Sequence, residues 1–541
     1  MKTSIHFGNW ALALLALSTF NPQLSTPLAA AIITVNNTND SGAGSLRQAI
    51  QSAATNDTIG FSVIGVITLT NGELLLTKSL TITGPGAANL AISGNTNSRV
   101  FEISSNVTAS ISALTLRDGH ASNGSDGGDG DNGGGIYNAG TLTLSACDIS
   151  ANRSGTGGYP IASGGNGGSG GGIYNAGTLT LSACTVSGNF GGVGALDRHG
   201  GNGGGIYNAG TLMFIACTVS GNFGGGGGAK QLQLSDVGGG AGGGIYNSGA
   251  LTLNGCTIAG NSAGRGGDGF TLAHYFPSPG GPGGGIYNSG TFTLTGCTVS
   301  GNSGGGGGHI LNVTGADGGS GGGIYNAAST LSANLHSALV AVNSVGSGGA
   351  PGGAAGSDPD VAGSFTSQGH NLIGQVGGST GFTNGVSADL SGSTNAPLDP
   401  MLGPLQDNGG PIFTMALLPG SPALDAGDDA LLAAPLNLAT DQRGFPRRSG
   451  AHVDIGAFEL LAAGAPPYLT APRKLANGAF QFSFGYNSGT SFTVLCAASL
   501  SLPVANWTVL GVATEIAPGQ FQFTDLQATN SARRFYRLRS P

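Results

Sequence analysis

The hexapeptide Gly-Gly-Gly-Ile-Tyr-Asn occurs six times in this chain, and it constrains the fold more than any other feature. Its tyrosines lie 33 to 41 residues apart, at Tyr137, Tyr174, Tyr207, Tyr246, Tyr287 and Tyr325. In the first five copies a Cys follows ten residues after the tyrosine, and an Asn follows fifteen residues after it. Length varies in the Gly-rich segment before the next copy. A unit of this size repeated in register predicts a solenoid or a propeller.

Each copy is predicted to form short strands. Residues 141–144 (Thr-Leu-Thr-Leu) alternate polar and apolar side chains, and the alternation resumes at Cys147 and Ile149, which is typical of half-buried strands. One copy cannot bury its apolar face alone, but coils stacked about 4.8 Å apart bury it continuously. We therefore expect a parallel β-helix, with Gly and Asn at the left-handed corners. A propeller is the alternative, but four strands per repeat are hard to find.

The segment before the repeats is predicted to continue and close the same solenoid. Residues 64–116 keep short alternating runs without the Gly block, which indicates tighter coils. Ahead of them, Leu46, Ala49, Ile50 and Ala53 fall on one face of a helix. A short amphipathic helix at this place would cap the open end of the core, as a solenoid requires.

The composition excludes several classes of protein. Gly accounts for 105 of the 541 residues, but it follows no three-residue period, and the chain has only 23 Pro; this excludes collagen. Charged residues make up 8 % and the formal net charge is −8. So few charges argue against a disordered polyelectrolyte, and their acidic balance argues against a nucleic-acid-binding protein.

The first 31 residues are predicted to be a secretory signal peptide. Lys2 precedes an apolar stretch at 10–20, and an Ala-rich cleavage signal follows at 29–31. The alternative is an N-terminal membrane anchor, but the apolar stretch is short for a membrane span. No later segment has 18 consecutive apolar residues. We therefore expect an exported protein whose mature chain has no transmembrane segment.

Four regions are predicted after the signal peptide. The β-helix occupies residues 32–365, and a turn-rich region with clustered charge, 366–461, closes its end. A Pro-containing linker covers 462–472. Residues 473–541 alternate aromatic and polar side chains, as at Phe480, Phe482 and Phe484, which predicts a small β-sandwich.

Three stretches resemble a family of exported bacterial proteins. Residues 35–50 are similar to the start of right-handed parallel β-helix proteins, and the hexapeptide repeat resembles that of polymorphic outer-membrane proteins. Residues 399–460 carry Gly-Ser-Pro-Ala-Leu-Asp-Ala-Gly, Asp-Gln-Arg-Gly-Phe-Pro-Arg and Asp-Ile-Gly-Ala-Phe-Glu, and they look like a choice-of-anchor Q domain. The resemblance implies a right-handed β-helix at the cell surface, associated with the bacterial outer membrane, without an assigned chemistry. The terminal apolar helix and basic residues of an expected anchor are not visible.

The Cys and Asn ladders are interpreted as structural. Stacked cysteines on parallel rungs keep their Cβ atoms farther apart than a disulfide prefers, so we expect small buried thiols. Cys496, in the last module, lies too far away to pair with them. The ladder that begins at Asn152 is expected to form amide hydrogen bonds along a corner of the solenoid.

The six repeat tyrosines are the candidate binding residues. Ile136 should point inward, and its neighbour Tyr137 should therefore point outward, which gives a stripe of six rings that could contact a glycan. The alternative, which the sequence favours, is that the rings pack beneath the Gly-rich loops.

Catalytic residues are hard to find. Hydrolysis of a glycosidic bond needs two carboxyl groups about 5 to 9.5 Å apart, and a lyase needs Ca²⁺-binding carboxylates with a basic residue. Asp148 stands alone, because the other repeats carry Thr at its position. The Gly-rich loops hold scattered charged residues, namely Asp126, Asp129, Asp131, Asp197, Arg198, His199, Arg265, Asp268 and His274. Residues 127–132 are one near-match to a Ca²⁺-binding nonapeptide, so Ca²⁺ is the one cofactor that the sequence suggests.

Charged residues are also dense near the end of the solenoid. They are Asp425, Asp428, Asp429, Asp441, Arg443, Arg447, Asp454 and Glu459. We interpret them as ion pairs and turn residues that close the β-helix.

The sequence thus predicts a secreted or cell-surface, adhesin-like β-helix protein without catalytic activity. Its expected partners are cell-surface components or an extracellular polysaccharide, and nucleic acid is not among them. The alternatives are a carbohydrate-active enzyme, which would be a polysaccharide lyase or a glycoside hydrolase, and a glycan-binding protein on the same scaffold.

Overall fold

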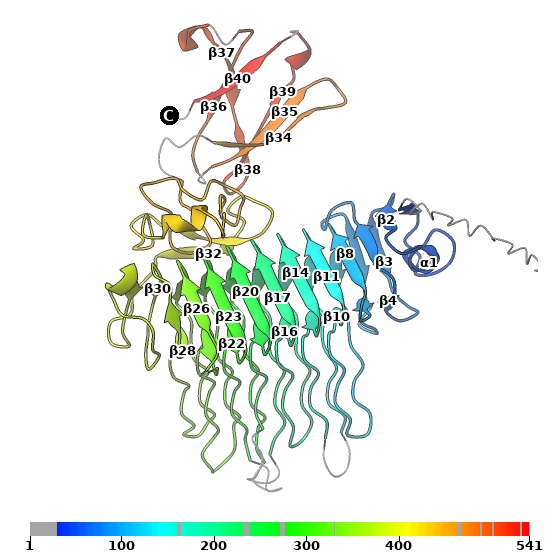
Figure 1. Ribbon diagram of the computed structural model, residues 1–541, viewed down its shortest axis with the longest axis vertical. Helices are drawn as coiled ribbons and strands as arrows, with labels where there is room; N and C mark the ends of the chain where they lie inside the picture. The colour runs from blue at the N-terminus through cyan, green and yellow to red at the C-terminus, as the bar shows by residue number, and fades with distance from the viewer. Residues whose placement is uncertain are drawn as a thin grey trace, which may run out of the picture.

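The computed structural model describes residues 30–159, 164–230, 237–270, 276–328, 330–461, 467–486, 489–499, 502–530 and 533–539. Residues 1–29 of the predicted signal peptide lie outside this set. Most described strands belong to a right-handed parallel β-helix, the rod in Figure 1. No helix in the described ranges is long and apolar enough to cross a membrane.

Each coil of the β-helix contributes strands to three parallel sheets. The first sheet contains β1 (Ile32–Val35), β2 (Thr58–Phe61), β5 (Leu80–Thr83), β8 (Thr108–Ser112), β11 (Thr141–Ser145), β14 (Thr178–Ser182), β17 (Thr211–Ile215), β20 (Ala250–Asn254), β23 (Thr291–Thr295), β26 (Ala333–His336) and β29 (Thr366–Ser367). The second sheet contains β4 (Leu74–Leu76), β7 (Phe101–Ile103), β10 (Ile136–Asn138), β13 (Ile173–Asn175), β16 (Ile206–Asn208), β19 (Ile245–Asn247), β22 (Ile286–Asn288), β25 (Ile324–Asn326) and β28 (Val361–Gly363). The third sheet contains β3 (Gly65–Thr68), β6 (Leu90–Ser93), β9 (Thr115–Arg117), β12 (Asp148–Ser150), β15 (Thr185–Ser187), β18 (Thr218–Ser220), β21 (Thr257–Ala259), β24 (Thr298–Ser300), β27 (Leu339–Ala341), β30 (Leu372–Ile373) and β31 (Leu390–Ser391).

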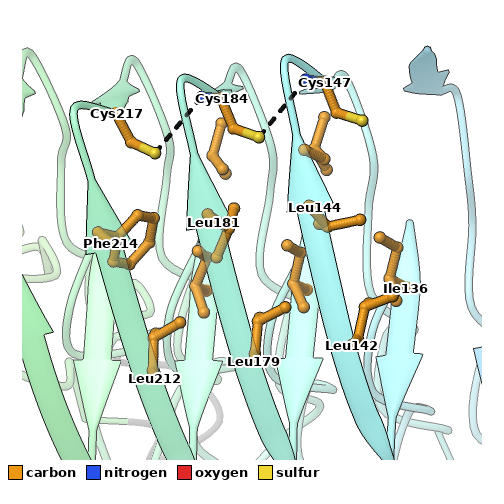
Figure 2. Close-up of a cluster of buried hydrophobic side chains, with 14 of the residues drawn as sticks. Ile136, Leu142, Leu144, Cys147, Leu179, Leu181, Cys184, Leu212, Phe214 and Cys217 are labelled. Carbon is orange, nitrogen blue, oxygen red and sulfur yellow. Dashed lines mark hydrogen bonds between the residues drawn. The ribbon is translucent and has the colours of Figure 1, made fainter. Parts of the chain in front are cut away.

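The core is built by stacking like residues on like residues. Leu142 pairs with Leu179, which pairs with Leu212, and all three side chains are buried. The cysteines stack in the same way, each inside the corner between the first and third sheets (Figure 2). The hydrophobic core therefore runs along the rod without interruption, as the alternating pattern of the repeats predicts.

The left-handed corners use Gly, as expected, and also Ala, but not the repeat Asn. The residue with positive φ is the one before Cys, such as Ala146 (φ 50°), and the one before Asn, such as Gly188 (φ 60°). The repeat asparagines are absent from the positive-φ residues. The expectation that Asn provides the corner conformation is therefore wrong, because Asn contributes its side-chain amide instead.

Both ends of the β-helix are closed. Ser45 is the N-cap of helix α1 (Leu46–Ser52), and its hydroxyl accepts a hydrogen bond from the N–H of Gln48. The helix buries Leu46, Ala49 and Ile50 against the core. This is the predicted cap. At the other end the parallel sheets continue through β31, so the β-helix extends beyond the predicted boundary at residue 365. The sequence did not indicate the last strands because each has only two residues, too few to show an alternating pattern.

The Gly-rich loops project from one side of the rod (Figure 1) and have a regular structure. In one loop, the N–H groups of Gly164, Gly167 and Gly170 donate to the next loop, and those of Gly165 and Gly168 donate to the outgoing limb of their own loop. This three-residue period matches polyproline II geometry. Cβ atoms added at most loop glycines would overlap a neighbouring backbone, so the loops pack only because these residues are Gly.

Two smaller parts follow the β-helix. The closing domain carries an antiparallel hairpin, β32 (Leu402–Gln406) and β33 (Thr414–Leu417). The C-terminal β-sandwich has one sheet of β34 (Tyr468–Lys474), β35 (Phe480–Gly485), β39 (Gln520–Asp525) and β38 (Thr514–Ala517), and another of β37 (Thr508–Val512), β36 (Thr493–Ala497) and β40 (Phe535–Arg539). Phe445 of the closing domain packs into the sandwich core with Phe484. Strand β34 begins at Tyr468, within the predicted linker 462–472.

Candidate functional site: a groove beneath the closing domain

The six repeat tyrosines form a continuous stack on the outer face of the second sheet. Neighbouring ring centroids are 4.8 to 5.5 Å apart, and neighbouring rings are within 9° of parallel. Each side chain is half-buried, and Arg99 covers the ring of Tyr137 at 5.5 Å.

This stacking determines what the tyrosines can offer to a ligand. An aromatic ring binds a sugar through its face, but the faces of Tyr174, Tyr207 and Tyr246 are occupied by neighbouring tyrosines. Burial, together with the neighbouring Tyr246 and Tyr325, raises the pKa of Tyr287 to about 12. Glycan contact by this stripe stays a prediction, and the contact would have to use ring edges and hydroxyl groups.

The Asn ladder has the predicted structural role. The side-chain N–H of Asn189 donates to Asn222 at 2.9 Å, and that of Asn222 donates to Asn261 at 2.8 Å. A second ladder begins at Asn138, with amide–amide distances of 2.7 to 2.8 Å. The first ladder ends at Asp360, which accepts from Asn343. A carboxylate suits the last rung because no further rung needs a donor.

All six cysteines are free and buried. In the ladder, the backbone N–H of one Cys donates to the sulfur of the next, as from Cys184 to Cys217 at 3.4 Å. Burial, with hydrogen bonds to its neighbours, raises the pKa of the Cys256 thiol. Although burial opposes the effect, hydrogen bonds from Cys184 and Cys256 shift the pKa of Cys217 the other way. The ladder therefore consists of packed thiols that burial shields from solvent.

The closing domain docks on the third sheet through a ladder of Thr residues. Thr218 donates its hydroxyl hydrogen to the carbonyl of Phe413 at 2.7 Å, and Thr257 contacts the Gln442 side chain at 2.5 Å. Thr298 accepts from the N–H of Ala457 at 3.0 Å. The coils before Thr218 continue this ladder with Thr185, Asp148 and Thr115, and they lie beyond the edge of the closing domain.

A groove of about 420 Å³ forms where the closing domain ends. Its lining residues are Ala87, Ala88, Thr115, Asp148, Thr185, Ser187, Thr218, Ser220, Pro411, Ile412 and Phe413. One wall is thus the hydroxyl ladder of the third sheet, and the other is the arm at 411–413. The side chain of Phe413 is 55 % exposed. The combination of hydroxyl groups with an exposed aromatic ring is typical of a small-ligand site.

Asp148 is the one carboxylate in this groove lining. Its Oδ2 accepts from the Ser150 hydroxyl at 3.1 Å, whereas its buried Oδ1 has no hydrogen-bond partner in the described structure. Burial raises the pKa of Asp148, although the Ser150 hydroxyl and the nearby Arg117 oppose this shift. Sequence reasoning noticed Asp148 as an exception in a Thr ladder, but it missed Phe413, which lies 265 positions later.

The charged residues of the Gly-rich loops do not reach this groove. The loops project from the side of the rod opposite the closing domain (Figure 1), and the contacts of Asp129 and Asp268 lie within the loops. Asp129 accepts from the N–H of Asn166 at 2.7 Å, and Arg265 pairs with Asp268 at 2.6 Å. His274 lies outside the described residues. Among those described, no group of three or more His, Cys, Asp or Glu side chains could hold a metal ion.

A second hollow, of about 520 Å³, lies at the end of the β-helix. Asp428 pairs with His336 at 2.9 Å, and Asp429 pairs with His452 at 3.2 Å. Although burial opposes the effect, the N–H of Ala430 and the His336 side chain lower the pKa of Asp428. These groups are paired in the way that the sequence predicted for the end of the solenoid.

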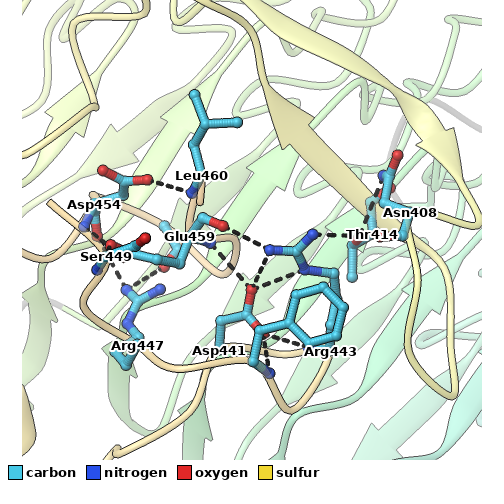
Figure 3. Close-up of polar contacts among 11 residues, drawn as sticks. Asn408, Thr414, Asp441, Arg443, Arg447, Ser449, Asp454, Glu459 and Leu460 are labelled. Carbon is cyan, nitrogen blue, oxygen red and sulfur yellow. Dashed lines mark hydrogen bonds and ion pairs between the residues drawn. The ribbon is translucent and has the colours of Figure 1, made fainter. Parts of the chain in front are cut away.

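A buried polar network holds the closing domain together (Figure 3). Arg443 binds Asp441 at 2.8 Å and the carbonyl of Glu459 at 2.6 Å. The Glu459 carboxylate accepts from the N–H groups of Ser449 and Asp454. Burial, followed by the charge of Asp454, raises the pKa of Glu459 to about 8. Because its charged side chains are buried and none of its members lines the groove, this network is structural.

The outer face of the first sheet is a regular surface without charge, covered only at Thr295, which is buried. On β8, β11, β14, β17, β20 and β23 its residues are Thr108, Ser110, Ser112, Thr141, Thr143, Ser145, Thr178, Thr180, Ser182, Thr211, Met213, Ile215, Ala250, Thr252, Asn254, Thr291, Thr293 and Thr295. Fourteen of these eighteen are Ser or Thr, and none is charged. We call this surface the hydroxyl face.

No protein-family model matches the chain, and no curated protein matches it. Function is therefore argued from the geometry of these surfaces.

Proposed function

We propose that this protein is exported to the bacterial cell surface, where it acts as a non-catalytic, adhesin-like scaffold. The hydroxyl face carries the proposal. It extends over six consecutive coils in register, and it offers hydroxyl and methyl groups at regular intervals to a broad, uncharged surface. Cell-surface components and extracellular polysaccharide are partners of this kind.

The stacked architecture supports a scaffold. Two Asn ladders, the Tyr stack and the interlocked Gly-rich loops tie each repeat coil to the next. A rod built in this way keeps its face flat, so many weak contacts can act together. Adhesion benefits from this arrangement because the contacts are ordered before binding.

The groove supports the non-catalytic part of the proposal. Glycoside hydrolysis uses two carboxyl groups, and the groove lining contains Asp148 alone. The observation that favours the alternative, a carbohydrate-active enzyme, is the raised pKa of Asp148, because a general acid needs such a shift.

The test scores adhesion and turnover together on the purified mature chain. Adsorption to bacterial cells and to insoluble polysaccharides is measured by depletion, and released reducing or unsaturated sugars are measured in the supernatant. Thr180→Lys places a charge on the hydroxyl face and should reduce adsorption. Ser52→Lys, an exposed position on α1, is the matched control and should adsorb like the wild type. Released sugar, or equal adsorption by both variants, would contradict the proposal.

A further inference from the structure

The groove at Asp148 continues along the rod. An adjoining hollow, of about 400 Å³, is bounded by Leu405 and Met415 of the hairpin and by the third sheet as far as Ser300. Ser220 lines both hollows. From the coil of Thr115 to that of Ser300 there are five coil-to-coil steps of about 4.8 Å, so the two hollows together span about 24 Å.

We propose that this groove binds a linear, uncharged polysaccharide that lies parallel to the axis of the β-helix. The shape favours a chain, because the groove crosses several coils and is bounded by the closing domain along its length. The site is distinct from the hydroxyl face, which belongs to the first sheet and has no such wall.

The charge of the lining selects the class of polysaccharide. Asp148 is the one charged residue among those that line the two hollows, and no Lys or Arg joins it. An anionic chain would therefore meet a carboxylate in the lining, while the nearby Arg117 lies outside the lining and pairs with Asp118; this arrangement costs an anionic ligand binding free energy. A neutral chain meets a row of partly exposed hydroxyl groups from Thr185, Ser187 and Ser220, and these both donate and accept hydrogen bonds.

Phe413 provides the apolar surface that a sugar ring needs. A pyranose has C–H groups on its faces and hydroxyl groups on its edges, so it packs its face on an aromatic ring while its edge bonds to polar groups. The Phe413 side chain is 55 % exposed, and its backbone is held against the sheet by Thr218 at 2.7 Å. The backbone that carries the ring is thus held in place before a ligand arrives, which reduces the entropy lost on binding.

Asp148 provides the strongest hydrogen-bond acceptor in the groove. Its Oδ1 has no partner, and leaving such a group unsatisfied is costly. Because that oxygen is shielded from solvent, a sugar hydroxyl would donate to Oδ2, the oxygen that also accepts from Ser150. The other repeats carry Thr at the same position, so Asp148 marks one end of the groove as different from the rest.

Isothermal titration of the mature chain with hexasaccharides tests this proposal. The probes are the β-1,4-glucan, β-1,3-glucan, β-1,4-mannan and β-1,4-xylan hexasaccharides, with hexagalacturonate as the anionic counterpart. At least one neutral probe should bind. Phe413→Ala and Asp148→Thr should each weaken binding about tenfold, because each removes one principal contact. Asp148→Thr installs the side chain that neighbouring coils already carry, so it preserves the fold.

Phe270→Ala is the matched control, since Phe270 is 61 % exposed on a Gly-rich loop. This variant should bind the hexasaccharides with the affinity of the wild type. The proposal is overturned if no neutral probe binds at about 1 mM, if hexagalacturonate binds more tightly, or if both groove variants bind like the wild type. Thr180→Lys should leave hexasaccharide binding unchanged. Sugar release would contradict the non-catalytic scaffold while leaving the groove as the binding site, so the two proposals fail separately.

Discussion

Replacing Asn222 by Ala is expected to destabilise the middle of the β-helix. The Asn222 side chain is fully buried and makes four hydrogen bonds. Its N–H group donates to Asn261 at 2.8 Å and to the carbonyl of Val186 at 2.9 Å. Its oxygen accepts from the backbone N–H of Asn189 at 3.0 Å and from the side chain of Asn189 at 2.9 Å.

The expected loss follows from these four bonds. At about 1 kcal/mol of net stability for each hydrogen bond, the free energy of unfolding should fall by about 4 kcal/mol. The backbone N–H of Asn189 also loses its acceptor inside the protein, which adds to the cost. By contrast, Asn261 keeps a donor, because the backbone N–H of residue 222 still reaches its oxygen at 3.0 Å.

Guanidinium unfolding followed by circular dichroism measures the change, and hydrogen exchange locates it. Because each coil of a solenoid contacts its neighbours only, lost protection should be concentrated in β15, β18 and β21. The control is Asn254→Thr, since the Oδ1 of Asn254 has no partner and the next coil carries Thr295; we expect a change below about 0.5 kcal/mol. A loss below about 1 kcal/mol for Asn222→Ala, with intact protection, would refute the reasoning.

Three further outcomes are expected. Gly225→Ala should lower the melting temperature strongly, because its Cβ would overlap a neighbouring loop backbone. Gly188→Ala meets no neighbouring atom and adds only the strain of a positive φ, which Ala151 already bears at the equivalent position, so its melting temperature should fall much less; equal melting temperatures would contradict this. Glu459 has a pKa of about 8 in the folded protein and 4.5 ordinarily, so the folded state keeps a proton that the unfolded state loses. The free energy of unfolding should therefore fall by about 4 kcal/mol as pH rises from about 4.5 to 8. Thermal melts at pH 5, 6.5 and 8.5 measure this slope, and Glu459→Gln should flatten it. Finally, Ellman's reagent should find no reactive thiol in the folded protein and six after denaturation, and rapid reaction of the folded protein would argue against the buried ladder.

Much of the β-helix could be predicted from the sequence because its interactions are periodic. Residues such as Leu142, Cys147 and Asn152 recur at fixed distances from the repeat Tyr, so each must meet its own copy in the next coil. The capping helix was predictable for a similar reason, since Leu46, Ala49 and Ile50 share one helical face. The corner residues were predicted less well, because the Ala and Gly residues that adopt a positive φ there form no distinctive sequence pattern.

The candidate site could not be predicted in the same way. The stripe of tyrosines was expected from the alternation at 136–138, but the sequence cannot tell that neighbouring rings stack face to face, since that depends on the distance between coils. Asp148 was visible as an exception in its ladder. Its neighbour Phe413 was not, because no periodicity relates the closing domain to the repeats.

The sequence by itself thus determined the coil, its ladders and its Gly-rich loops, because these rest on contacts between equivalent residues. The tertiary structure alone decided which part of the Thr ladder is covered and which part is open. That boundary depends on where residues 402–460 come to rest on the third sheet, and they are held there by hydrogen bonds such as those of Thr218 and Thr298 with residues far along the chain. The closing domain makes its contact nearest the N-terminus of the Thr ladder at Thr218. The coils of Asp148 and Thr185 lie before that contact, so their side chains face the arm at 411–413 and line the groove.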